Sequence, residues 1–220
     1  MFKYIIASLV LLIFTSCISN NGKIKSDIDV KWIVKSDDSI FTPGILRLRT
    51  DVLEQQNDTI LLIDKNEEIR DFICSTNEHE PAFVNAKDVT IRSYYPDNYV
   101  LILDAFELNN QYKVYFNRDW FIIPKLEGVT IYEDWEIHLK NTYILTDSKN
   151  PLRVEPNENS YEMSYDYSLL NFVCKKIEGD WIYVTCNIDC EGCPIDNENL
   201  KGWLKWKEGN KLLIKLYYSC

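Results

Sequence analysis

Two short stretches near the C-terminus decide the predicted fold: GDWIYV at residues 179–184 and KGWLKW at residues 201–206. Along a strand, alternation places Trp181 on one face and Ile182 on the other. A glycine just before an aromatic residue allows the tight backbone entry that a small, strongly bent sheet needs. The two stretches therefore predict strands of a compact β-barrel.

The order of three segments in this region resembles the bacterial SH3-like domain: PLRVEP at 151–156, GDWIYV at 179–184 and GWLKW at 202–206. The resemblance implies a small barrel over residues 150–220 that binds cell-wall or peptide ligands. The region is also similar to exported lipoproteins of Gram-negative bacteria, with which it shares the Asp-Cys-x-x-Cys-Pro loop at 189–194. Neither resemblance implies a reaction.

Residues 1–16 are predicted to be a secretory signal peptide. Lys3 precedes an apolar run that ends at Phe14, and this run is too short to cross a bilayer as a mature helix. Thr15-Ser16-Cys17 resembles a bacterial lipoprotein signal, although Phe14 departs from its usual leucine. The resemblance implies that Cys17 becomes the lipid-bearing first residue; an ordinary cleaved signal with an incidental cysteine is the alternative.

A lipid on Cys17 would make the membrane a partner and place the protein in the cell envelope, anchored to the outer membrane. Residues 17–27 are polar and aperiodic, which is typical of a flexible tether. The remaining chain is long enough for one larger or two small domains whose core needs no metal.

The charge balance is acidic. The 220-residue chain has a net charge of −10, which becomes −11 without residues 1–16, because Lys3 is their only charged residue. Nucleic-acid binding rewards clustered lysine and arginine, so we expect no nucleic-acid partner. No cofactor is predicted either.

Residues 28–85 are predicted to form an α+β region. Strands are expected at 30–34, 45–49 and 59–63, where β-branched residues are frequent. A helix is expected at 65–74, with acidic residues in its first turn and one apolar stripe.

Residues 86–140 are predicted to form a β-meander. Its hairpin joins 112–116 to 120–123 through Asn117-Arg118-Asp119, and a short helix follows at 133–139. The order of Val89, Val114 and Trp120 is similar to that of a first SH3-like barrel, although Asp119 stands where a glycine is usual. Unrelated antiparallel strands are the alternative, and the domain boundary is expected within 141–150. The predicted fold class is therefore mainly β, with one or two short helices and a C-terminal barrel.

Six cysteines remain besides Cys17: Cys74, Cys174, Cys186, Cys190, Cys193 and Cys220. An even number in an exported protein indicates disulfides. Cys190 and Cys193 are the favoured pair, because Gly192 closes a small ring and Pro194 ends a strand. Cys186 with Cys220 is a second candidate pair, and Cys74 is expected to be free. The alternatives for 186–193 are an iron–sulfur site, or a zinc site with Cys174 or Cys220 as fourth ligand.

Catalysis is not expected. The chain has only two histidines, and His79 lies in a polar segment expected to be a solvated loop. His138 is expected to pack beside Trp135, three residues away. No nucleophile and base are placed together by any motif, so the sequence predicts a protein that is not an enzyme.

Ligand binding is the favoured function, because aromatic side chains bind sugars and peptides at little entropic cost. The predicted ligand-binding cluster consists of Tyr161, Tyr165, Trp181, Trp203 and Trp206. Alternation allows at most one of Trp203 and Trp206 to be exposed, and several of the rings are expected in the core. The predicted function is a non-catalytic envelope module that binds cell-wall glycan or peptide, with peptidoglycan or an envelope protein as partner. The alternatives are an immunity or inhibitor lipoprotein that blocks a toxin or enzyme, and a purely structural envelope protein.

Overall fold

The computed structural model describes residues 31–34, 42–56, 59–75, 81–83, 88–95, 98–167, 170–187, 193 and 200–218. The predicted signal peptide, Cys17 and the tether lie outside these residues. The described chain is mainly β, as predicted, with eighteen strands and two six-residue helices. Neither helix is long enough to span a membrane.

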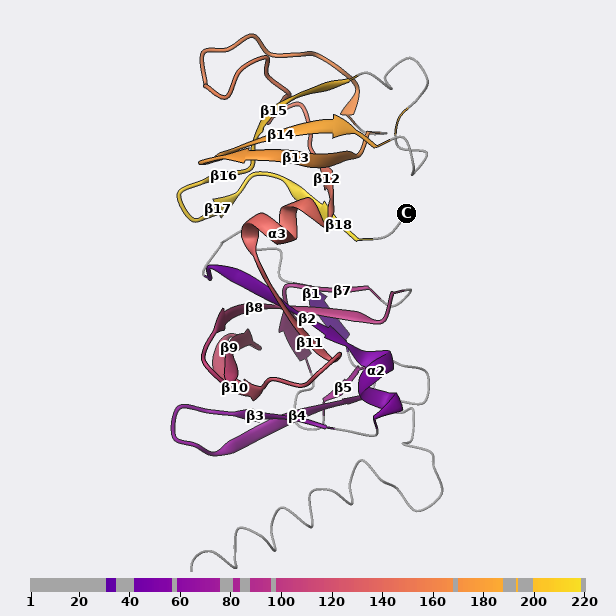
Figure 1. The fold of residues 1–220 in the computed structure, drawn as a ribbon, viewed down its shortest axis with the longest axis vertical. Coiled ribbons are helices and arrows are strands. Elements are labelled where there is room, and N and C mark those ends of the chain that lie inside the picture. The colour runs from indigo at the N-terminus through magenta and orange to yellow at the C-terminus, as the bar shows by residue number, and fades with distance from the viewer. Residues whose placement is uncertain are drawn as a thin grey trace, which may run out of the picture.

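The N-terminal part of the molecule is one nine-stranded sheet (Figure 1). Its strands run in the order β11 (Thr130–Asp134), β2 (Gly44–Arg49), β8 (Val100–Glu107), β9 (Gln111–Phe116), β10 (Asp119–Pro124), β3 (Ile60–Ile63), β4 (Ile69–Ser75) and β5 (Pro81–Phe83), with β7 (Ser93–Tyr95) also on β8. A separate parallel pair joins β1 (Lys31–Val34) to β6 (Asp88–Ile91).

This pairing corrects the predicted division between 28–85 and 86–140. Strand β2 lies between β8 and β11, and β3 pairs with β10, so both regions contribute to one sheet. The separate first barrel expected at 86–140 is therefore not formed, because its strands complete a sheet that begins with β2.

The helix predicted at 65–74 is wrong. The carboxylate of Asp64 accepts hydrogen bonds from the backbone N–H groups of Asn66 and Glu68 and closes a turn. Strand β4 then pairs with β3, which places Ile73 opposite Ile60 in the core. The helix of this region is instead α2 (Thr50–Gln55), whose Leu53 is buried.

The hairpin predicted around Asn117 is confirmed. Strands β9 and β10 are joined by Asn117 and Arg118, whose φ angles are 49° and 68°. Two consecutive positive φ angles define the type I′ turn, whose twist matches that of the flanking strands.

Strand β8 is buried on both faces. Leu101 and Leu103 pack into a core within the N-terminal sheet, whereas Val100 and Ile102 join a second core with the C-terminal part. Burial on both sides explains why the first half of this strand, residues 100–103, is a continuous apolar run. The N-terminal sheet thus supplies one wall of the C-terminal core.

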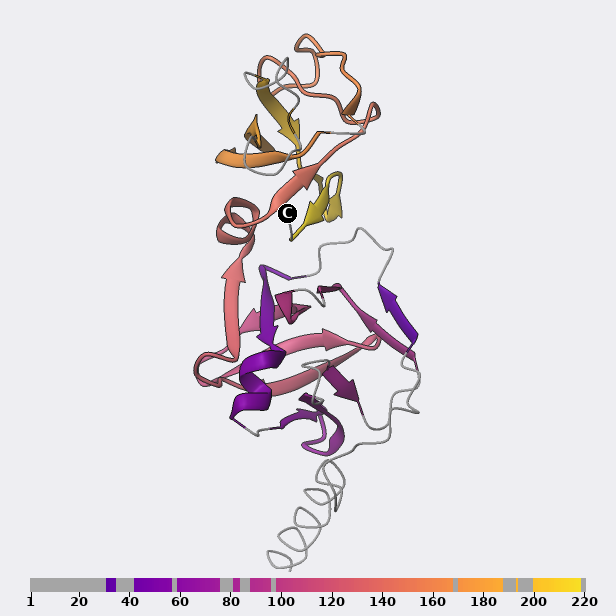
Figure 2. The ribbon, with the colours of Figure 1, turned by 90° about the vertical axis from the view of Figure 1, so that its right-hand side faces the viewer.

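The chain passes to its C-terminal part through β11 and α3 (Trp135–Lys140), as Figure 2 shows. The Asp134 carboxylate caps α3 by accepting the Ile137 N–H at 2.7 Å. A five-stranded antiparallel sheet follows, in the order β15 (Lys201–Lys205), β14 (Trp181–Cys186), β13 (Phe172–Glu178), β12 (Tyr143–Leu145) and β18 (Lys215–Tyr217). This sheet begins at Tyr143, before the predicted start at 150. The short helix predicted at 133–139 is confirmed.

The C-terminal sheet does not close into the predicted barrel. Among the described residues no ladder joins β15 to β18, and a small hairpin of β16 (Lys207–Glu208) and β17 (Lys211–Leu212) lies between them. Arg153 covers the middle of β15 through two backbone hydrogen bonds with Trp203, each 2.8 Å long. A Cβ atom on Gly202 would lie 2.9 Å from the Arg153 carbonyl oxygen, so this approach requires glycine.

The two parts are also joined by a buried polar chain. Arg47 donates to Glu133 at 3.0 Å, and Glu133 lies 2.8 Å from His138 Nδ1. His138 Nε2 lies 2.6 Å from the Tyr218 hydroxyl. Burial lowers the pKa of His138, so the neutral ring donates from Nδ1 to Glu133 and accepts the Tyr218 proton. The prediction that His138 packs beside Trp135 is confirmed by a ring separation of 5.7 Å.

Candidate functional site

The outer face of the C-terminal sheet carries a row of aromatic side chains. On β14, Ile182 and Val184 are buried while Trp181 and Tyr183 are partly exposed, as alternation predicts. Tyr183 is paired with Trp203 on β15, and their rings meet edge to face at 5.3 Å. The three aromatic residues therefore lie on one outward-facing surface, which we call the aromatic face.

Cations border the aromatic face. Lys176 Nζ lies 5.5 Å from the centre of the Trp203 ring, within range of a cation–π contact. Lys205 is paired with Trp181 across the β14–β15 ladder. The face therefore combines flat apolar area with positively charged groups.

A pocket of about 520 Å³ adjoins the aromatic face, and we call it the edge pocket. Its walls come from the ends of β12 and β15 and the starts of β14 and β18, together with residues 211–214. This is where β15 and β18 would have to meet for the barrel to close. The volume falls within the usual range of small-molecule sites.

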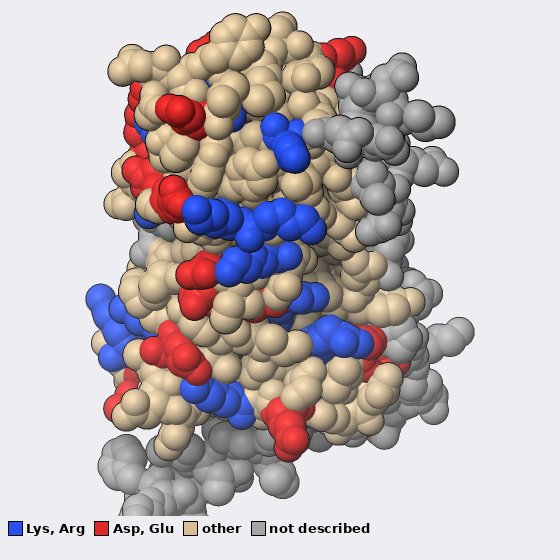
Figure 3. All heavy atoms as spheres, turned by 45° about the horizontal axis from the view of Figure 1, so that its top comes forward, with Lys and Arg blue, Asp and Glu red and all other residues tan. Residues whose placement is uncertain are grey.

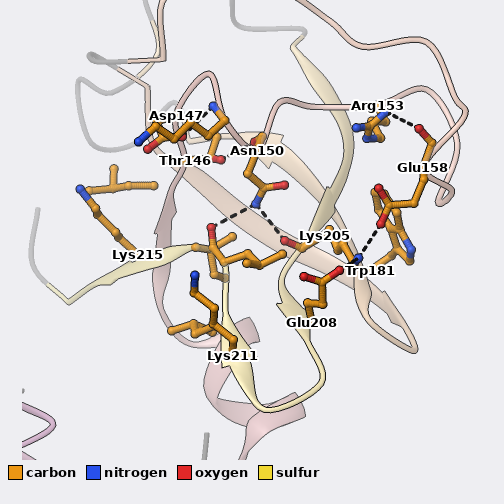
Figure 4. Close-up of a pocket in the computed structure, with 15 residues that line it drawn as sticks. Thr146, Asp147, Asn150, Arg153, Glu158, Trp181, Lys205, Glu208, Lys211 and Lys215 are labelled. Atoms are coloured by element: carbon orange, nitrogen blue, oxygen red, sulfur yellow. Dashed lines mark hydrogen bonds and ion pairs between the residues drawn. The ribbon is translucent and has the colours of Figure 1, made fainter. Parts of the chain in front are cut away.

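Asn150 ties two walls of the edge pocket together and fixes the distance between them. Its Nδ2 donates to the carbonyl oxygens of Lys205 at 2.8 Å and Leu213 at 3.1 Å (Figure 4). The backbone carbonyl oxygen of Asn150 accepts a hydrogen bond from Thr146 Oγ1 at 2.6 Å. One side chain thus links the end of β15 to the segment before β18, and it satisfies backbone groups that an unpaired edge would leave exposed.

The edge pocket is positively charged, unlike the chain as a whole. Five basic side chains line it, against the three acidic side chains of Asp147, Glu158 and Glu208, a surplus of two positive charges. Both glutamates contact Lys205 Nζ, and hydrogen bonding to that ammonium lowers the pKa of Glu158. Figure 3 shows a band of lysine and arginine side chains across the middle of one face, with acidic side chains beside it.

The structure separates the five residues of the predicted aromatic cluster. Trp181 and Trp203 lie on the aromatic face, but Trp206 is 5% exposed and packs against Trp135 at 6.0 Å. Tyr161 and Tyr165 are exposed in the loop before β13, and no ring contact joins either of them to the three tryptophans among the described residues. The prediction that at most one of Trp203 and Trp206 is exposed is confirmed.

Sequence reasoning missed other members of the site. Tyr183 could have been found, because alternation places it on the same face as Trp181. Asn150 and Lys215 gave no local signal, since only the folding of β18 against β12 brings them to the pocket.

The predicted Cys190–Cys193 disulfide is wrong, because Cys193 is bonded to Cys186. Their Cα atoms are 5.9 Å apart, a normal separation for a disulfide, and both residues pack at the C-terminal core. Cys190 lies outside the described residues. The bond also removes Cys186 from the candidate pair with Cys220 and from the metal-site alternatives. Cys174 is free and buried, and burial raises its pKa to about 11.

No family model, curated protein or solved structure matches this chain. The interpretation of the site therefore depends on its geometry and charge.

Proposed function

We propose that this protein is a non-catalytic binding module of the cell envelope, tethered by a lipid at Cys17. In this proposal a cell-wall glycan or peptide lies against the aromatic face. The observation that carries the proposal is the alignment of Trp181, Tyr183 and Trp203 on one outward surface beside a pocket. Such rings offer large rigid contact area, which suits sugar rings and extended peptides.

The pairing of the two tryptophan stretches supports a relationship to bacterial SH3-like domains. The stretches that carry the resemblance, 179–184 and 201–206, contribute adjacent strands in register, with Tyr183 opposite Trp203. The last strand, β18, returns to the first strand of the sheet, β12. The last and first strands of the sheet therefore lie side by side, although β15 and β18 form no ladder among the described residues.

The state of His138 supports a role without catalysis. Both of its ring nitrogens are engaged, one with Glu133 and one with Tyr218, and the side chain is fully buried. A general base must reach the proton that it removes from a substrate. His138 instead joins the two parts of the molecule.

Retention of the full-length chain, in detergent, on insoluble peptidoglycan tests the proposal. Trp203→Ala should weaken retention about tenfold, since stacking of one ring contributes roughly 1–2 kcal/mol. The matched control is Trp120→Ala, which removes an outward tryptophan of the N-terminal sheet that also lies beneath a lysine. Circular dichroism would confirm that each variant is folded.

Equal retention of the wild type and Trp203→Ala would contradict the proposed aromatic face. Failure of the wild type to bind would contradict peptidoglycan as the ligand. The next candidate would then be the alternative of an immunity or inhibitor lipoprotein, whose association with a toxin or enzyme should slow in salt.

A further inference from the structure

The edge pocket has features of a ligand site that the aromatic face does not require. It lies at the open edge of the sheet, Asn150 fixes its width, and Trp181 contributes both to its wall and to the aromatic face. A ligand on the aromatic face could therefore extend a substituent into the pocket.

The charged side chains of the pocket indicate which chemical group of a ligand it would bind. Glu158 and Glu208 are already bound to Lys205, and Arg153 is bound to Glu162. Lys149, Lys211 and Lys215 form no salt bridge with any residue that the structure describes. Figure 4 shows Lys211 and Lys215 on the side of the pocket opposite the Lys205 cluster. The pocket thus offers three ammonium groups outside any salt bridge among the described residues, against the single carboxylate of Asp147 that is not paired with Lys205.

We propose that the edge pocket binds a carboxylate group of the ligand, held by Lys211 and Lys215, while the rest of the ligand reaches across the pocket to Trp181. This inference rests on the proposed function, because it assumes a ligand on the aromatic face. A carboxylate accepts several charge-assisted hydrogen bonds, and lysine ammonium groups donate them without demanding a fixed geometry. Asn150 Nδ2 already donates to two backbone carbonyls, so this amide group shapes the site and does not donate to the ligand.

Cell-wall polymers carry carboxylates of two kinds, on an acidic amino sugar or at the end of a peptide. Three small probes separate these sources: N-acetylmuramic acid, N-acetyl-D-alanyl-D-alanine and the neutral N-acetylglucosamine. Saturation-transfer NMR on the full-length chain in detergent would measure their dissociation constants. At least one acidic probe should bind about fivefold or more tightly than the neutral sugar, and added salt should weaken it.

The double variant K211Q/K215Q should lose about fivefold in affinity for the acidic probe and leave the neutral sugar unchanged. Lys201→Gln is the matched control, because Lys201 is exposed on β15 but does not line the pocket. Equal binding of acidic and neutral probes by the wild type would overturn the inference. Unchanged affinity in the double variant would overturn it as well.

The peptidoglycan assay separates this inference from the proposed function. Retention on peptidoglycan that depends on Trp203, combined with equal binding of acidic and neutral probes, would support ligand binding at the aromatic face. The same result would contradict carboxylate binding in the edge pocket. Carboxylate binding that depends on Lys211 and Lys215, combined with no retention on peptidoglycan, would support the carboxylate site in the edge pocket. It would contradict the cell wall as the source of the ligand.

Discussion

The two sheets carry similar tryptophans in different surroundings. On the N-terminal sheet, Trp120 lies beneath Lys113 at 5.0 Å and packs on Tyr115 at 5.1 Å. On the C-terminal sheet, Trp203 lies beneath Lys176 and packs on Tyr183, next to a pocket. An aromatic cluster under a cation is thus not sufficient to indicate a site. The adjoining edge pocket distinguishes the C-terminal cluster.

The hydrophobic cores of the two sheets also differ. The N-terminal sheet encloses a core of its own residues, whereas the C-terminal core includes Ile45, Val100 and Ile102 from the other sheet. The C-terminal sheet therefore depends on the N-terminal one for its inner face. Its outer face carries the partly exposed side chains of Trp181, Tyr183 and Trp203.

The largest expected effect comes from two neighbouring core residues. Leu101→Ala and Ile102→Ala should each reduce the free energy of unfolding by about 3 kcal/mol, because both side chains are fully buried. Only Ile102→Ala should speed hydrogen exchange in β13 and β14, because Ile102 packs into the core shared with the C-terminal sheet. Equal exchange patterns in the two variants would contradict the asymmetry.

A smaller effect is expected from the disulfide. Reducing Cys186–Cys193, or replacing Cys193 by serine, should cost about 2 kcal/mol, because the bond closes a short loop. Denaturant unfolding would measure the change in the free energy of unfolding. Hydrogen exchange should become faster only in the C-terminal sheet. Faster hydrogen exchange in β2 and β8 as well would contradict the view that the N-terminal core is separate from the C-terminal core.

The last expected effect is a loss of stability at acidic pH. Burial raises the pKa of Glu133, but hydrogen bonds from His138 and Arg47 outweigh it and lower the pKa overall. The pKa of His138 is also lowered. Each group therefore stabilises the fold above its unfolded-state pKa and loses that contribution as pH falls, from about 6.5 for His138 and about 4.5 for Glu133.

Melting temperatures measured between pH 7.5 and 4 test this dependence of stability on pH. Each proton taken up on unfolding lowers the free energy of unfolding by at most about 1.4 kcal/mol per pH unit. His138→Gln should remove the part of the loss that begins near pH 6.5. Glu136→Gln, which alters an exposed carboxylate on α3, is the matched control. A profile unchanged by His138→Gln would show that the junction does not sense pH.

Much of the β architecture could be predicted from the sequence. Alternation identified β14 and β15 with the correct faces, and Asn117-Arg118 identified the hairpin. The helix expected at 65–74 failed because a ten-residue segment carries too little pattern to separate helix from strand. Pairing with β3 decided the outcome.

The site was less predictable than the fold, because it depends on contacts between distant segments. Alternation found Trp181 and Trp203 but could not show that the sheet stays open. Local spacing favoured Cys190 as the partner of Cys193, whereas the fold brings Cys186 to it from the end of β14. The basic pocket arises from residues that meet only in the folded chain.

The most direct test of the central claim is hydrogen exchange of the full-length chain with and without soluble cell-wall fragments. We expect slower exchange in β14, β15 and residues 145–150, and no change in β9 and β10 around Trp120. Protection around Trp120 instead, or no protection anywhere at saturating fragment, would contradict a ligand site on the C-terminal sheet.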